Sequence, residues 1–151
     1  MKALQLTAPG VTLLSEVPLP SLTPGKALIR MKAASLNRRD EWIKEGKYPG
    51  IKYGVVLGSD GCGVVEKVHD ESDQHWVGQE VIINPNIGWG PDPEVQAKNY
   101  TILGMPVDGT FAEYCALPTD RLQRKPLHLN PHLHLKPLYD KLLRLQYFYY
   151  L

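Results

Sequence analysis

The chain has 151 residues, 43% of them hydrophobic and 22% charged, with a formal net charge of +1 at pH 7. This composition is typical of a soluble globular protein with one domain and at most a short appendage. The near-neutral balance gives no general attraction to nucleic acid or to an anionic membrane, so we expect neither as a partner. No apolar run is long enough for a signal peptide or a membrane span, and the two cysteines lack metal-binding spacing, which favours a reduced, cytoplasmic protein.

Short apolar runs separated by Pro and Gly predict a mainly β domain with a barrel-like sheet. The domain is expected to hold one or two short helices. The stretch 37–45 predicts one of them, with one or two turns, because Asn37 can cap its start and Gly46 stands where a C-terminal glycine belongs. Residues 84–106 are rich in Pro and Gly and are expected to form a long loop. The predicted strands fall at 3–6, 11–16, 27–34, 63–68, 80–83 and 110–117.

Gly58, Gly61 and Gly63 form the densest glycine cluster of the chain. Their spacing comes close to a dinucleotide-binding fingerprint, but the third glycine is missing. The apolar run also follows the glycines, whereas the fingerprint needs a strand before them and a helix after them. We therefore expect a glycine-rich turn that leads into a strand, without phosphate binding.

Several ordered segments together resemble the N-terminal domain of the medium-chain dehydrogenase/reductase superfamily, and most closely its zinc-free, quinone-oxidoreductase-like branch. The resemblance implies a GroES-like, partly open β-barrel over residues 1–129, with no Rossmann domain. The segments that carry it are 17–20 with 24–31, 33–40, 46–50, 58–66, 76–81 and 108–114.

Residues 130–151 form an atypical tail that is basic, lacks glycine and ends in clustered aromatic residues. In the superfamily the corresponding stretch leads into a large nucleotide-binding domain. The compositional break suggests a truncated or frame-shifted product, although a genuine tail is also open as an interpretation.

The resemblance also bears on metal binding. Zinc-dependent members carry a Cys where Asn37 stands and a His-Glu pair where Ser59 and Asp60 stand. Amide and hydroxyl groups are poor zinc ligands beside thiolate and imidazole. A structural zinc would need cysteines in 84–106, which has none. We expect no metal.

By the same resemblance, a pocket for the nicotinamide and the substrate lies beside the stretch after the first long strand. Asn37 and Tyr48 are assigned to the cofactor, since an amide can bind the nicotinamide or its ribose and a phenol can donate to a carbonyl or stack on it. The residues assigned to the substrate pocket are Asp40, Trp42, Ser59 and Asp60.

Structural alternatives exist for some of these residues. Asn37 could serve only as a helix cap, Asp40 could pair with Arg38 or Arg39, and Trp42 could belong to the core. The cysteines, Cys62 and Cys115, are expected to be packed and unreactive, because nothing near them in sequence would lower their pKa.

The favoured function is therefore the substrate-side catalytic domain of a zinc-independent, NAD(P)H-dependent oxidoreductase that acts on a quinone, an enone or a related carbonyl. NADP or NAD is expected for the full-length family, with none bound firmly by this chain alone, and a homo-oligomer is possible. No catalytic acid or base is assigned. The alternative is a non-catalytic fragment or interaction module with the same fold.

Overall fold

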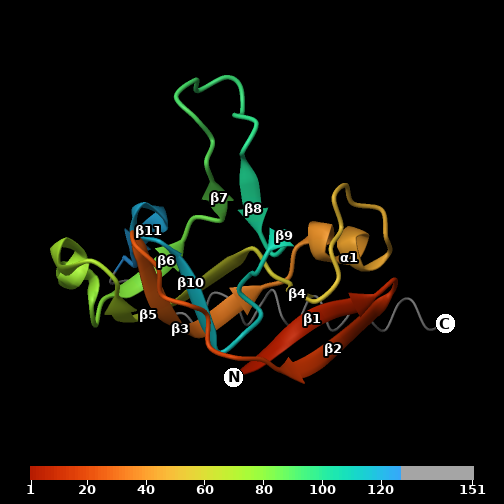
Figure 1. Cartoon of the computed structure of the whole chain (residues 1–151), viewed down its shortest axis with the longest axis horizontal. Helices are drawn as coiled ribbons and strands as arrows, with labels where there is room; N and C mark the ends of the chain where they lie inside the picture. Colours follow the sequence, from red (N-terminus) through yellow and green to blue (C-terminus); the bar gives the residue numbers. More distant parts are fainter. Residues whose placement is uncertain (127–151) are drawn as a thin grey trace.

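The computed structural model describes residues 1–126, which form a β-rich body with one α-helix at its side and an arm that rises away from it (Figure 1). The expected boundary at residue 129 and the tail at 130–151 lie outside the described residues. None of the described helices is long and apolar enough to span a bilayer.

The architecture is mainly β, as predicted. The helices are α1 (Arg38–Lys44) and two short 3₁₀ helices, η1 (Glu71–Trp76) and η2 (Thr119–Arg121). The strands are β1 (Lys2–Ala8), β2 (Val11–Glu16), β3 (Lys26–Ser35), β4 (Val55–Val56), β5 (Asp60–Val68), β6 (Glu80–Ile83), β7 (Asn86–Ile87), β8 (Thr101–Leu103), β9 (Pro106–Val107), β10 (Tyr114–Pro118) and β11 (Leu122–Arg124).

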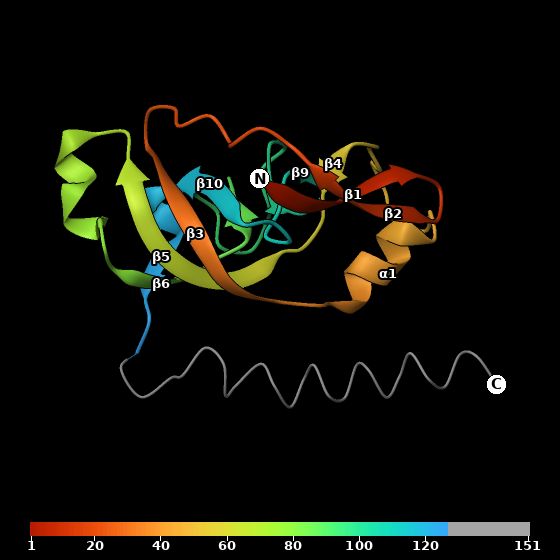
Figure 2. The ribbon, with the colours of Figure 1, turned by 90° about the horizontal axis from the view of Figure 1, so that it is seen from below.

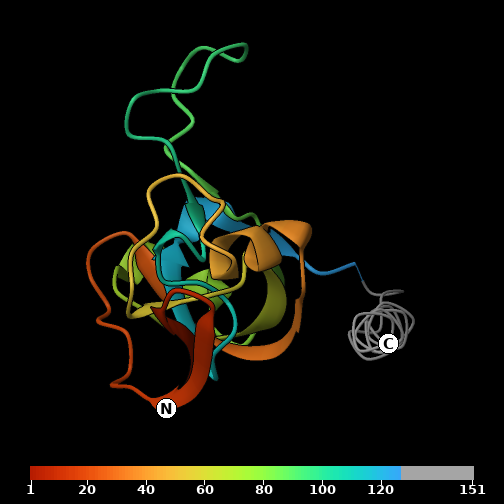
Figure 3. The ribbon, with the colours of Figure 1, turned by 90° about the vertical axis from the view of Figure 1, so that its right-hand side faces the viewer.

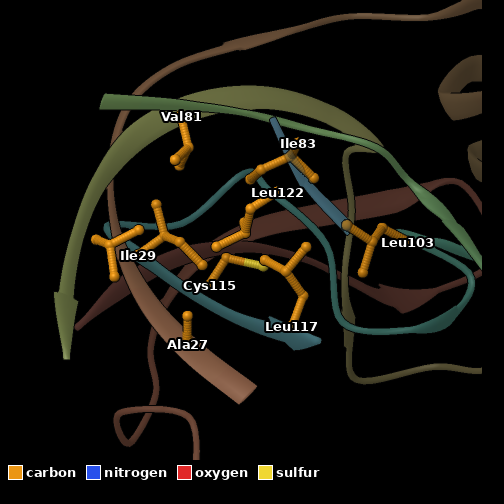
Figure 4. Close-up of a cluster of buried hydrophobic side chains, with 9 residues drawn as sticks. Ala27, Ile29, Val81, Ile83, Leu103, Cys115, Leu117 and Leu122 are labelled. Carbon is orange, nitrogen blue, oxygen red and sulfur yellow. The ribbon is translucent and has the colours of Figure 1, made fainter. Parts of the chain in front are cut away.

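A five-stranded antiparallel sheet with the order β10-β3-β5-β6-β11 forms the larger part of the barrel. Its two longest strands, β3 and β5, bend strongly around the interior (Figure 2). Alternate residues of these strands point inward and exclude water, which is the main stabilising contribution. The side chains of this first core, all but Val65 labelled in Figure 4, are Ala27, Ile29, Val65, Val81, Ile83, Leu103, Cys115, Leu117 and Leu122.

A second core lies between the small sheet β2-β1-β4 and helix α1. Leu6 of β1 and Ile43 of α1 are both fully buried there, together with Leu57 and Met105. The turn of the β1–β2 hairpin is tied to the helix, since the Gly10 N–H donates to the carbonyl of the last helical residue at 2.9 Å. This core therefore fixes the helix against the barrel.

Helix α1 begins and ends close to the predicted positions. Asn37 occupies the N-cap position, and its backbone N–H donates to the carboxylate of Asp40 at 2.8 Å. Gly46 ends the helix with a φ of 78°, a left-handed conformation that glycine adopts without steric cost. Its N–H donates to the carbonyl of Ile43 at 3.1 Å.

The stretch 84–106 differs from the expected loop, because it contains β7 and β8 and forms the arm between them (Figures 1 and 3). The rings of Trp89 and Tyr100 meet edge-on at 5.1 Å, and the Tyr100 hydroxyl donates to Asn86. Strands of two or three residues have no recognisable pattern in sequence, which explains the difference.

The glycine cluster also differs from the expected turn. Strand β5 starts at Asp60, so Gly61 and Gly63 lie inside it and pair with β3. A Cβ atom at Gly63 would overlap the main-chain carbonyl of Arg30. These two glycines therefore permit close approach of two strands, while only Gly58, with a φ of 90°, makes the turn.

Three glycine backbones meet beside this turn. A Cβ atom at Gly104 would lie 2.6 Å from the Gly58 carbonyl oxygen, and one at Gly109 would overlap that oxygen and approach the Gly104 Cα atom at 2.7 Å. The same Gly58 oxygen accepts the N–H of Thr110 at 3.0 Å. This contact, which we call the triglycine contact, joins the chain at 58, 104 and 109.

We expect Gly109→Ala to lower the free energy of unfolding by more than about 3 kcal/mol, because the added methyl group overlaps main-chain atoms that cannot rotate away. The control is Gly50→Ala, where φ is 70° and no atom lies within 4 Å. That change should cost only the about 1–2 kcal/mol of left-handed strain. Equilibrium unfolding in urea measures both, and equal losses would contradict the importance of the triglycine contact.

Candidate functional site

Asn37, Ser59 and Asp60 come together where β3 passes into α1 and β5 begins. The β3–β5 register places Ser35 opposite Asp60, so residues that are far apart in sequence meet at one end of the pair. The side-chain amide nitrogen of Asn37 donates to Asp60 Oδ2 at 2.6 Å and lies 3.3 Å from Ser59 Oγ. We call these three residues the amide cluster.

The amide cluster is held from two sides. Asp40 is buried, and its Oδ2 accepts the backbone N–H of Asn37, which fixes the start of the helix. On the other side, the buried hydroxyl of Thr110 donates to the main-chain carbonyl of Asp60 at 2.9 Å. The orientation of the Asn37 amide therefore depends on main-chain anchors as well as on its own contacts.

Burial raises the pKa of the Asp40 carboxyl above its ordinary value, and the nearby Asp60 carboxylate adds to this effect. Hydrogen bonds from main-chain N–H groups and the charge of Arg39 oppose it without cancelling it. No ion pair joins Asp40 to Arg38 or Arg39 among residues 1–126, so that structural alternative is wrong.

Arg39 has no role in the sequence-based prediction beyond a possible pairing with Asp40. Its guanidinium is half-buried and donates to the main-chain carbonyls of Leu103 at 2.7 Å and Met105 at 3.3 Å. It also donates to the Tyr48 hydroxyl at 3.3 Å and lies 5.0 Å from the centre of that ring. The Arg-Arg doublet in sequence gives no sign of which member turns inward.

Trp42 does not belong to the core. The residue is 48% exposed on α1, whereas its neighbour Ile43 is fully buried in the second core. The structural alternative for Trp42 is therefore wrong, and its assignment to the substrate pocket stays a prediction.

Neither cysteine has the character of a nucleophile. Burial raises the pKa of Cys115 to about 12, as expected for a thiol inside the first core. Cys62 is half-buried rather than fully packed, and burial together with the Glu80 carboxylate raises its pKa as well. Both thiols stay protonated at neutral pH.

The donor chemistry of the amide cluster does not fit zinc. Asp60 supplies one carboxylate, while Ser59 supplies a neutral hydroxyl and Asn37 turns its amide N–H₂ toward Asp60. Zinc sites in proteins use thiolate, imidazole and carboxylate ligands. In the described part of the chain, no three His, Cys, Asp or Glu side chains gather in a way that could hold a metal ion.

A separate groove of about 670 Å³ lies between the N-terminal strand, the stretch 17–26 and strand β10. Ser21, Lys26 and Tyr114 line it together with mostly apolar residues. None of the predicted site residues lines this groove. It therefore serves as a reference surface for tests of the amide cluster.

We expect the thermal midpoint of Asp40→Asn to rise relative to the wild type as the pH rises from about 3.8 to 7. Below the ordinary pKa the carboxyl is neutral in both the folded and the unfolded chain. As the pH passes through the raised folded pKa, the wild type must place a charge in a buried position and loses stability, which the variant avoids. Thermal unfolding followed by circular dichroism measures the difference. The exposed Glu94→Gln should show no such trend, and a flat difference for Asp40→Asn would contradict the burial effect.

The sequence and the fold are similar to those of known proteins. The alcohol dehydrogenase GroES-like domain family matches residues 23–127. A zinc-type alcohol dehydrogenase-like protein of Schizosaccharomyces pombe is 37% identical over 116 residues, which cover 76% of this chain and 33% of that protein.

Two solved structures show the same fold. An NAD-dependent alcohol dehydrogenase is 34% identical with a TM-score of 0.75, covering 87% of this chain and 41% of its own. A presumed zinc-binding dehydrogenase of Sinorhizobium meliloti 1021, bound to NADP, is 28% identical with a TM-score of 0.73, covering 86% and 40%.

The chain thus spans about a third to two fifths of the length of these relatives. The match to the family extends over most of the described barrel, including α1 and the amide cluster. The chain belongs to the alcohol dehydrogenase GroES-like domain family, within the medium-chain dehydrogenase/reductase superfamily.

Proposed function

We propose that this chain is the substrate-side domain of an NAD(P)H-dependent oxidoreductase that works without zinc and acts on a quinone, an enone or a related carbonyl. The observation that carries the proposal is the hydrogen bond from the Asn37 amide to Asp60, with Ser59 beside it. This contact occupies the positions that the family resemblance assigns to zinc ligands. Because a relative of this chain is named as zinc-type, an experiment has to distinguish zinc-dependent from zinc-independent chemistry.

Hydrogen-bond donors take the place of a Lewis acid in this proposal. Ser59 is buried and its oxygen accepts from the Asn37 amide, which leaves its hydroxyl hydrogen to donate to a carbonyl oxygen that reaches the amide cluster. The Tyr48 oxygen accepts from Arg39, which likewise leaves its hydrogen available. Donors that are held in place by the fold can orient a carbonyl oxygen and stabilise the charge that develops on it.

The nicotinamide would supply the hydride, and the protein would bind and orient the two partners. The described residues contain no alternation of parallel strands and helices of the kind that binds a dinucleotide. We therefore expect Asn37 and Tyr48 to contact only the nicotinamide end, and the chain alone to bind NADPH with a dissociation constant above about 1 mM.

Titration of the ¹⁵N-labelled chain with duroquinone tests this function, because its fully methylated ring does not alkylate thiols. We expect chemical-shift changes centred on Asn37, Ser59 and Asp60, and about fivefold weaker binding in Ser59→Ala through the loss of one hydrogen bond. Ser21→Ala makes the same change in the separate groove and should leave the affinity unchanged. Shifts that centre on the groove, or no saturable shifts, would refute the proposal.

Elemental analysis tests the zinc-independent part. Protein purified in the presence of zinc and without chelator should contain much less than one zinc per chain, because the amide cluster offers one carboxylate and no thiolate or imidazole. The double variant Asn37→Cys, Ser59→His supplies the missing ligands and serves as the positive control. Stoichiometric zinc in the wild type would overturn this part of the proposal.

A further inference from the structure

We propose that Arg39 is a positioning residue that makes the Tyr48 hydroxyl a directed hydrogen-bond donor, so that the site selects ligands with an acceptor oxygen, such as a ketone or a quinone. The inference rests on the proposed function, since it assigns a role within the same substrate side. It goes further because it names the residue that sets the direction of the Tyr48 donor.

The guanidinium of Arg39 is fixed before any ligand arrives. Its Nη1 donates to the carbonyl of Leu103 and its Nη2 to that of Met105, and both acceptors belong to the main chain of the segment that carries β8 and β9. A planar guanidinium that is bound on two sides cannot turn. Leu103 and Met105 are themselves buried in the first and second cores, so this support is rigid.

The ring of Tyr48 is fixed as well. It packs against the second core, where Leu57 and Met105 are buried, and the Arg39 guanidinium lies 5.0 Å from its centre. The hydroxyl oxygen accepts from Arg39 Nη2. Arginine has no acceptor, so the direction of this bond is unambiguous. Among residues 1–126 no acceptor is recorded for the hydroxyl hydrogen of Tyr48, which is free to donate.

This arrangement favours ligands that carry an acceptor oxygen. A phenol whose oxygen already accepts from a cation presents its hydrogen outward, and a charged neighbour strengthens such a bond. A carbonyl oxygen satisfies this donor, whereas an isosteric alkene leaves it without a partner in the contact. A site built around a polar group rejects an analogue that cannot pair with it.

The experiment compares acetophenone with α-methylstyrene, which has the same shape but a methylene group in place of the carbonyl oxygen. Titrations of the full chain, labelled with ¹³C at tyrosine Cζ, should show about fivefold tighter binding of acetophenone, the ratio that one net hydrogen bond supplies. The Tyr48 Cζ signal should move with acetophenone and stay in place with α-methylstyrene.

Three variants test which residues cause the preference for acetophenone. Tyr48→Phe should abolish the preference while it leaves the α-methylstyrene affinity and the two Arg39–carbonyl bonds unchanged. Arg39→Lys should reduce the preference by at least half and shift the Tyr48 Cζ signal even without ligand. Tyr53→Phe, at an exposed position of the same stretch, is the matched control and should change nothing.

Equal binding of the two compounds by the wild type, or a preference that survives Tyr48→Phe, would overturn the inference while the proposed function stood. Absence of acetophenone binding overturns it too. If the wild type prefers acetophenone through Tyr48 but Ser59→Ala leaves the affinity for duroquinone unchanged, the donor role of Tyr48 holds and the proposed function fails.

Discussion

The triglycine contact is the constraint on which the rest of the molecule depends. It brings the turn at Gly58, which precedes the amide cluster, against the main chain at Gly104 and Gly109. Gly104 lies between Leu103 of the first core and Met105 of the second, so one backbone contact sets the distance between the two cores. The same carbonyl oxygen of Gly58 binds the N–H of Thr110, whose side chain then supports Asp60. A methyl group at Gly104 or Gly109 would separate the segments that together form the site.

The sequence predicts the long elements well, because their apolar residues repeat over enough positions to show a period. Strands β1, β2, β3, β5, β6 and β10 and helix α1 fall at or near their predicted ranges. Strands β4, β7, β8, β9 and β11 contain two or three residues each, and they exist because a neighbouring strand supplies their partners. Gly61 and Gly63 illustrate the same limit. Their spacing indicates a tight backbone, but only the position of β3 shows that a strand passes there instead of a turn.

Some residues of the site could likewise be predicted from the sequence, and others could not. Family resemblance singles out Asn37, Ser59 and Asp60, and the β3–β5 register brings them within hydrogen-bonding distance. Arg39 could not be found in this way, because it binds main-chain carbonyls that any residue would offer. Its inward direction depends on the rotation of α1, which Ile43 sets by entering the second core. Trp42, the neighbour of Ile43, is consequently turned outward in spite of its large apolar ring.

The buried carboxylate of Asp40 does not serve stability. Asp40 would gain solvation if it were exposed, and its raised pKa shows that the fold destabilises its charge. Replacing such groups by apolar residues of similar volume often leaves stability unchanged or improves it. What the buried carboxylate does achieve is to hold the backbone of Asn37, while the Arg39 guanidinium holds the hydroxyl of Tyr48. Asp40 and Arg39 of α1 thus each fix a neutral donor in their neighbourhood. Donors held by such a second layer need no reorganisation when a ligand binds, which is the property that orientation of a carbonyl requires.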